Sequence, residues 1–222
     1  MHTVVIKINL IKNKIKEIIE KKQLKISEPK IVVVSKTFPL SKITPLLENG
    51  HVHFAENKVK EAEEKWRGVK NKYTNCKLHM VGKLQSNKAK KAVELFDYIH
   101  SLDNAKLAEK ISKYEKEINK RTKLFIQINI GQEKQKSGII IEDLKPFYDY
   151  CVKQLSLDII GLMILPPNDE DPEKYFELLQ KTSTKMNLNQ LSMGMSNDYL
   201  RAIVYGATYI RLGTAILGDR SN

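Results

Sequence analysis

The sequence predicts an α/β fold, a single (β/α)8 TIM barrel preceded by one extra helix. Eight short apolar runs recur along its 222 residues, and charged segments with helical periodicity lie between them. No low-complexity linker interrupts this alternation. Strands that alternate with helices form parallel sheets, and eight such units in one chain are typical of a closed barrel. We therefore expect residues 1–222 to form one domain.

The extra helix is expected near the N-terminus. Apolar residues recur there every three or four positions, which is the spacing of one helix face: Val4, Ile8, Ile11, Ile15, Ile18 and Ile19. Lysines interrupt this series too often for a secretory signal or a membrane span. The segment is therefore predicted to be an amphipathic helix that packs on the barrel.

The eight apolar runs are the predicted strands, and the first is rich in β-branched residues. They span residues 31–35, 52–54, 77–81, 98–102, 124–130, 159–165, 190–193 and 208–212. An open doubly wound sheet is the alternative, but such sheets normally carry a glycine-rich loop after the first strand. Residues 35–39 contain no glycine, which favours the barrel.

Seven further helices are predicted between these strands from apolar periodicity and from capping residues at their starts. They span about 41–49, 56–71, 86–95, 104–119, 142–154, 171–187 and 197–205. Asn104 can cap the fourth of them, and Pro172 suits the first turn of the sixth.

The formal net charge of +12 comes mainly from lysine, which is spread along the chain and mixed with glutamate. Aromatic residues make up only 7%, so a stacking platform for nucleic acid is not indicated. A solvated lysine coat is the favoured interpretation, and binding of a polyanion is an open alternative. Neither a specific nucleic acid nor a membrane is expected as a partner.

Metal and disulfide chemistry find little support in the sequence. Cys76 and Cys151 lie far apart, which favours a reducing, cytoplasmic location. His51 and His53 alternate near Glu56, but a third aligned ligand is not evident. We expect structural histidines and no metal site.

Lys36 is the first candidate functional residue, because it follows a strand that should be buried on both faces. Desolvation lowers the pKa of a lysine and makes its amine a nucleophile that can form a Schiff base with a carbonyl. In a barrel, the carboxyl ends of all strands meet at one mouth. There the loops at 193–198 and 211–214 offer glycines and a helix start, which suit a phosphate. Both features together favour a phosphorylated aldehyde such as pyridoxal 5'-phosphate (PLP).

Several ordered blocks of the sequence carry a family resemblance. They include VVVSKTFP at 32–39, FAENKVKE at 54–61, LHMVGKLQSNK at 78–88, INIGQEKQKSG at 128–138, LSMGMSNDYLRAI at 191–203 and GATYIRLGTAILG at 206–218. With these blocks the chain resembles the YggS/PROSC family of PLP homeostasis proteins, whose barrel is similar to the N-terminal domain of alanine racemase. Ala55 and Leu78 depart from the Gly and Trp usual in that family, and we expect these changes to affect the rim of the mouth.

The resemblance implies a set of cofactor-binding residues. Lys36 would carry the Schiff base, Arg211 would face the pyridine nitrogen, and the remaining residues would hold the phosphate or line the cofactor: Ser196, Gly213, Thr214, Asn57 and Met163. Lys136 is a possible accessory amine, although a solvated loop lysine is the simpler interpretation.

The resemblance further implies a carrier that buffers PLP and delivers it to PLP-dependent apoenzymes, acting without catalysis and as a monomer. An amino-acid racemase is the alternative. An arginine at the pyridine nitrogen limits the ring as an electron sink, and racemisation needs acid–base groups on both faces of the substrate. Alanine racemases take the second group from a separate β-domain, for which we expect no room before Asn222.

Overall fold

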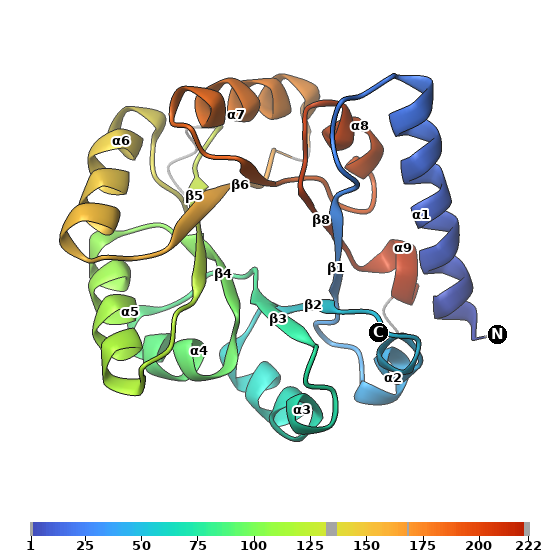
Figure 1. Cartoon of the computed structure of the whole chain (residues 1–222), viewed down its shortest axis with the longest axis horizontal. Helices are drawn as coiled ribbons and strands as arrows, with labels where there is room; N and C mark the ends of the chain where they lie inside the picture. The colour runs from blue at the N-terminus through green and yellow to red at the C-terminus, as the bar shows by residue number, and fades with distance from the viewer. Residues whose placement is uncertain (1, 132–136, 168, 220–222) are drawn as a thin grey trace.

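The structure is a computed structural model that describes residues 2–131, 137–167 and 169–219. Eight parallel strands close into a barrel in sequential order, and helices surround it (Figure 1). The strands are β1 (Lys30–Val34), β2 (His53–Glu56), β3 (Lys77–Met80), β4 (Tyr98–Leu102), β5 (Lys123–Ile128), β6 (Ile159–Ile164), β7 (Gln190–Ser192) and β8 (Tyr209–Leu212). The predicted (β/α)8 barrel is confirmed.

The helices follow the strands in alternation, as predicted. They are α1 (Thr3–Lys21), α2 (Leu40–Glu48), α3 (Val59–Lys72), α4 (Ala89–Leu95), α5 (Ala105–Ile118), α6 (Ile141–Asp149), α7 (Glu173–Lys185), α8 (Tyr199–Val204) and α9 (Thr214–Leu217). A 3₁₀ turn, η1 (Ser86–Lys88), precedes α4, and a π-helical turn, η2 (Tyr150–Gln154), extends α6. The predicted cap of α5 is confirmed, because Asn104 accepts a hydrogen bond from the Leu107 N–H at 2.9 Å.

Alternation along each strand divides the apolar core into two parts. In β1, Ile31 and Val33 face the helices, whereas Val32 points into the barrel. The side chains inside the barrel form the interior layer, which consists of Val32, Ala55, Tyr98, Phe125, Met163 and Tyr209. Ala55 and Leu78 are both fully buried, Ala55 in the interior layer and Leu78 on the side of the helices.

Helix α1 lies outside the barrel, where it packs on α2, α8 and α9 (Figure 1). Its buried face consists of Val4, Val5, Ile8, Ile11 and Ile15, which confirms the predicted amphipathic helix. No helix in the described residues is long and apolar enough to cross a membrane.

Most element boundaries differ from the prediction by one or two residues, and two elements differ more. The third helix begins at Val59 instead of residue 56, because Glu56 ends β2 and its side chain bonds to groups around it. Helix α9 was missed altogether. It has only four residues, and such a segment is too short for its apolar spacing to distinguish a helix from the end of a strand.

Histidines occupy part of the barrel interior. His79 stacks on Tyr98 with ring centroids 4.2 Å apart, and His100 stacks on Phe125 at 4.3 Å. Inside the barrel, His79 hydrogen-bonds to two other histidines, His53 and His100.

Burial lowers the pKa of four histidines, His51, His53, His79 and His100, because desolvation disfavours the imidazolium. The pKa of His51 and of His53 falls to about 4, and nearby lysines contribute to both shifts. The pKa values of His79 and His100 are lowered well below the usual value, with Arg211 adding to the effect on His100. All four are therefore neutral at pH 7.

These shifts predict a pH-dependent stability. An unfolded histidine has a pKa of about 6.5, so below that pH the unfolded chain binds protons that the folded chain does not. The free energy of unfolding should fall as the pH is lowered from about 6.5 toward 4, by up to about 1.4 kcal/mol per pH unit for each histidine. Urea unfolding at pH 7.5, 6.5 and 5.5 measures this slope. His51→Gln should reduce it, whereas the same change at the exposed His2 should not; equal slopes in both variants would contradict the assignment.

Candidate functional site

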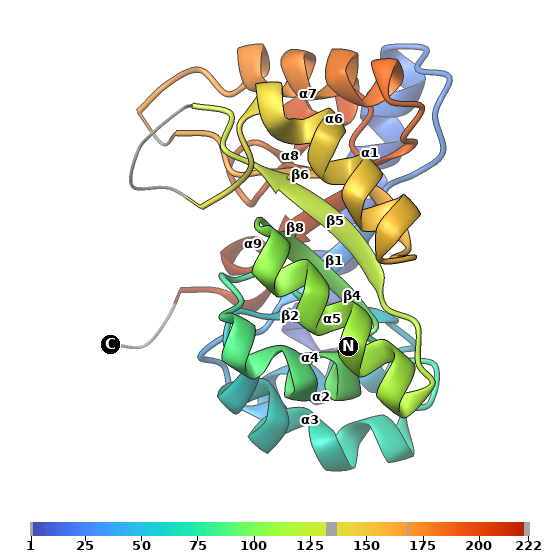
Figure 2. The same cartoon turned by 90° about the vertical axis from the view of Figure 1, so that its left-hand side faces the viewer.

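The carboxyl ends of the strands lie on one side of the barrel, together with α9 and the loops after β5 and β6 (Figure 2). Lys36 follows β1 at this end and is half-buried. Strand β1 pairs with β2 on one side and with β8 on the other, with Val34 opposite Ala55 and Val32 opposite Arg211. The loop that carries Lys36 therefore lies between the loops that follow β2 and β8.

The loops after β7 and β8 are joined by hydrogen bonds. The Arg211 N–H donates to the Gly194 carbonyl at 2.9 Å, and the Ser196 hydroxyl accepts from the Ala215 N–H at 3.2 Å. Gly194 has a φ of +89°, and a Cβ there would lie 2.7 Å from the Cβ of Ala202. Only glycine suits that position. The structure thus brings Ser196 to the start of α9, beside Gly213 and Thr214.

Arg211 is a buried cation, with 4% of its surface exposed. It donates to the Ser192 hydroxyl at 2.6 Å and to the Ile164 carbonyl at 2.9 Å. Within the described residues, it forms no ion pair with a carboxylate. Burial lowers its pKa to about 10, opposed by Asp198, so it is charged at pH 7. A buried charge with neutral partners is suited to an electron-rich group of a ligand.

Asn57 is half-buried in the loop after β2, whereas Met163 is fully buried inside the barrel. A Cβ on Gly82 would lie 2.3 Å from the Asn57 carbonyl oxygen. Glycine at 82 thus allows the loops after β2 and β3 to touch. Met163 is fully buried in the interior layer, paired with Ser192 across β6 and β7. It packs beside the residue that accepts from Arg211.

Side chains behind β1 form a buried network that the sequence did not reveal. Glu56 is fully buried, and its Oε1 accepts from the Ser35 hydroxyl at 2.7 Å, Lys65 Nζ at 2.9 Å and Trp66 Nε1 at 2.9 Å. Lys65 also donates to the Ser35 carbonyl at 2.8 Å and pairs with Glu61 at 3.2 Å.

The same network reaches the residue after Lys36. Thr37 has a φ of +67°, which is a strained conformation for a β-branched residue. Its N–H donates to Glu61 Oε1. Helix α3 therefore fixes the backbone on both sides of Lys36, through Ser35 and Thr37; we call Glu61 and Lys65 the α3 clamp. The spacing of Glu61 and Lys65, four residues on one helix face, was the only signal in the sequence.

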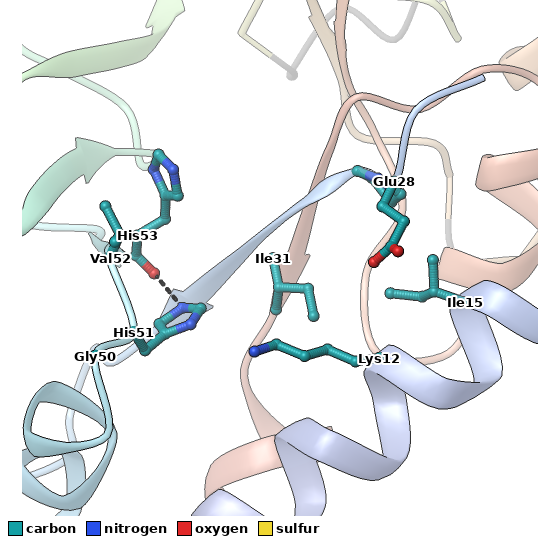
Figure 3. A pocket seen from close by; sticks show the side chains of 9 residues that line it. Lys12, Ile15, Glu28, Ile31, Gly50, His51, Val52 and His53 are labelled. Atoms are coloured by element: carbon teal, nitrogen blue, oxygen red, sulfur yellow. Dashed lines mark hydrogen bonds between the residues drawn. The ribbon is translucent and has the colours of Figure 1, made fainter.

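A pocket of about 260 Å³ lies at the opposite end of β1 and β2 (Figure 3). Its lining comes from α1, the start of β1 and the segment before β2: Lys12, Ile15, Glu28, Pro29, Ile31, Gly50, His51, Val52 and His53. The predicted cofactor residues do not line it. His51 Nε2 bonds to the His53 carbonyl at 3.0 Å, and the described residues contain no group of three or more side chains suited to a metal ion.

Lys136, the possible accessory amine, lies outside the described residues.

Comparisons with known proteins identify the family of this chain. Residues 6–221 match the family described as alanine racemase, N-terminal domain. The PLP homeostasis protein of Synechocystis is 39% identical over 200 residues, covering 86% of this chain and 91% of that protein. The PLP homeostasis protein of Haemophilus influenzae is 34% identical over 224 residues, and this match covers 96% of this chain and 94% of that protein.

Solved structures give the same result. PipY of Synechococcus elongatus, determined without PLP, is 32% identical and has a TM-score of 0.82, covering 92% of this chain and all of PipY. The PipY structure with PLP bound has a TM-score of 0.80. This chain therefore belongs to the PLP homeostasis protein family, whose barrel is that of the alanine racemase N-terminal domain.

Proposed function

We propose that this protein serves PLP homeostasis, holding PLP as a reversible Schiff base on Lys36, buffering it and delivering it to PLP-dependent apoenzymes. The observation that carries the proposal is the mouth itself, where the Lys36 loop lies beside the β8 loop and the buried cation Arg211. PLP bound there supplies an aldehyde that condenses reversibly with a lysine amine and releases water. Residues 1–222 act as one PLP-binding domain and as a monomer.

Each proposed residue has a distinct role. Arg211 donates to the pyridine nitrogen, and its permanent charge keeps that nitrogen unprotonated. Ser196, Gly213 and Thr214 hold the phosphate where the β7 and β8 loops are joined. Asn57 borders the Lys36 loop on the β2 side, and Met163 lies beside Ser192, which accepts from Arg211.

Racemase activity is not favoured by the positions of the tyrosines. Tyr150, Tyr175 and Tyr205 donate to glutamates on the helices or beside them. The Tyr209 hydroxyl accepts a hydrogen bond from Lys30 Nζ, and Lys30 lies at the amino end of β1, opposite the mouth. Racemisation needs a second acid–base group across the ring from Lys36, and the bonds of these four hydroxyls do not favour any of them for that role.

The Schiff base is tested at Lys36. With PLP added, the protein should show a Schiff-base absorption band, and borohydride reduction should attach the cofactor to the peptide that contains residue 36, as read by mass spectrometry. Lys36→Ala should abolish both signals. Lys42→Ala, at an exposed lysine on α2, is the matched control and should retain them. Persistence of the band in Lys36→Ala would reject the proposed attachment.

The carrier role is tested against the racemase alternative. PLP-loaded protein incubated with L- or D-alanine in deuterated water should introduce no more α-deuterium than Lys36→Ala does, because racemisation needs a second acid–base group and the four tyrosine hydroxyls above are engaged in other bonds. Proton NMR of the amino acid measures the exchange. Deuteration with multiple turnovers would establish a racemase instead.

The α3 clamp predicts a change in PLP affinity. Glu61→Ala removes the acceptor that holds Thr37 and should weaken PLP binding roughly 5- to 30-fold, equivalent to about 1–2 kcal/mol. Absorbance titration measures the affinity. Glu64→Ala is the control, because Glu64 lies on the same helix in an exposed ion pair with Lys60. If both variants bind PLP equally well, the clamp does not position Lys36.

A further inference from the structure

Three histidines form a continuous row of hydrogen bonds through the barrel, the histidine row: the half-buried His53 and the fully buried His79 and His100. His53 Nδ1 lies 3.0 Å from His79 Nε2, and His79 Nδ1 lies 2.9 Å from His100 Nε2. His100 Nδ1 lies 2.7 Å from the oxygen of the Ser192 hydroxyl, and that oxygen accepts a hydrogen bond from Arg211. The row therefore connects the cation of the proposed cofactor site to the start of β2.

The far end of the row lies beside the pocket at the amino ends of the strands. His53 contributes to the lining of that pocket, and its ring points away from the Lys12 side chain (Figure 3). Lys30 and Lys77 further disfavour a charged His53, and Asp97 opposes them only in part. All three rings of the row are thus neutral at pH 7.

The number of protons fixes the direction of this row. A neutral imidazole has one N–H, so each contact between two rings joins one donor to one acceptor. Arg211 can only donate, and it occupies one lone pair of the Ser192 oxygen. If the Ser192 hydroxyl donates to His100 Nδ1, every ring donates from Nε2 and accepts at Nδ1.

The opposite direction leaves a hydroxyl proton without an acceptor. Ser192 would then accept from both His100 and Arg211, and its own O–H would need a third partner. Within the described residues, the side-chain bonds of Ser192 lead only to His100 and Arg211. Ser192 is fully buried, so an unpaired hydroxyl there would be costly.

We propose that the histidine row positions Arg211: His79 and His100, locked as Nε2–H tautomers, orient the Ser192 hydroxyl so that it accepts from the guanidinium. A hydroxyl that donates a hydrogen bond is a stronger acceptor, so the row strengthens the bond to Arg211. Because all its members are neutral, the row holds the guanidinium without cancelling its charge. The consequence for PLP rests on the proposed function.

The tautomers are measured directly in the protein without PLP. Long-range ¹H–¹⁵N NMR of the ¹⁵N-histidine-labelled chain at pH 7 should show neutral Nε2–H rings for His53, His79 and His100, assigned with single-site variants. An Nδ1–H tautomer or a charged ring at His79 or His100 would overturn the proposal. This experiment does not depend on cofactor binding, so it separates failure of the row from failure of the proposed function.

Substitutions at His79 test the effect on PLP. His79→Leu removes the acceptor for His100 and should weaken PLP binding roughly 3- to 10-fold and shift the Schiff-base absorption maximum. His79→Asn places an amide oxygen near the position of Nδ1 and should restore both towards wild type. Identical behaviour of the two variants, or an unchanged affinity and spectrum in His79→Leu, would overturn the positioning role.

The matched control is Phe125→Leu, in the same interior layer. Phe125 stacks on His100 but lies outside the row of hydrogen bonds. This variant should lower the unfolding temperature yet leave the histidine tautomers and the absorption maximum unchanged. A spectral shift as large as that of His79→Leu would show that packing alone sets the signal, which would overturn the proposal.

Discussion

The buried guanidinium of Arg211 is the constraint on which the arrangement of the mouth depends. A cation in a low-dielectric interior is tolerated only when its N–H groups are satisfied, and a carboxylate is the usual partner. Here the described partners are a hydroxyl and a carbonyl, both neutral. The charge is therefore preserved for whatever enters the mouth. A carboxylate in place of Ser192 would hold the arginine equally well but would neutralise it.

The mouth is rigid on both sides of Lys36, for two different reasons. Helix α3 fixes the adjacent backbone through charged side chains, and Glu61 holds Thr37 in a conformation that it would otherwise avoid. On the β8 side, the backbone bond from Arg211 to Gly194 and the contact of Ser196 with α9 join two loops. The proposed Schiff base would suit such a frame, because Lys36 would need little reordering when the bond forms or breaks.

The sequence was sufficient for the barrel and for the location of the mouth, because both follow from patterns along the chain. Parallel strands bring their carboxyl ends together, so Lys36, Ser196 and Arg211 could be assigned to one end before any coordinates. The histidine row could not be predicted, since its members come from β2, β3 and β4 and its links depend on which way each ring points. The contact of Glu61 with Thr37 likewise joins residues 24 apart through a side-chain orientation. Helix α9 was too short to show a period.

The histidine row links the stability of the barrel to the state of its mouth. Its rings are neutral because they are buried, and only neutral rings can form a row with a single direction. The same burial makes the folded state less stable whenever solvent is acidic enough to protonate histidine in the unfolded chain. An apolar interior would avoid that cost, but it would leave the proton of the Ser192 hydroxyl without the acceptor that His100 provides. The polar interior is thus best understood as support for a charge that the site must keep.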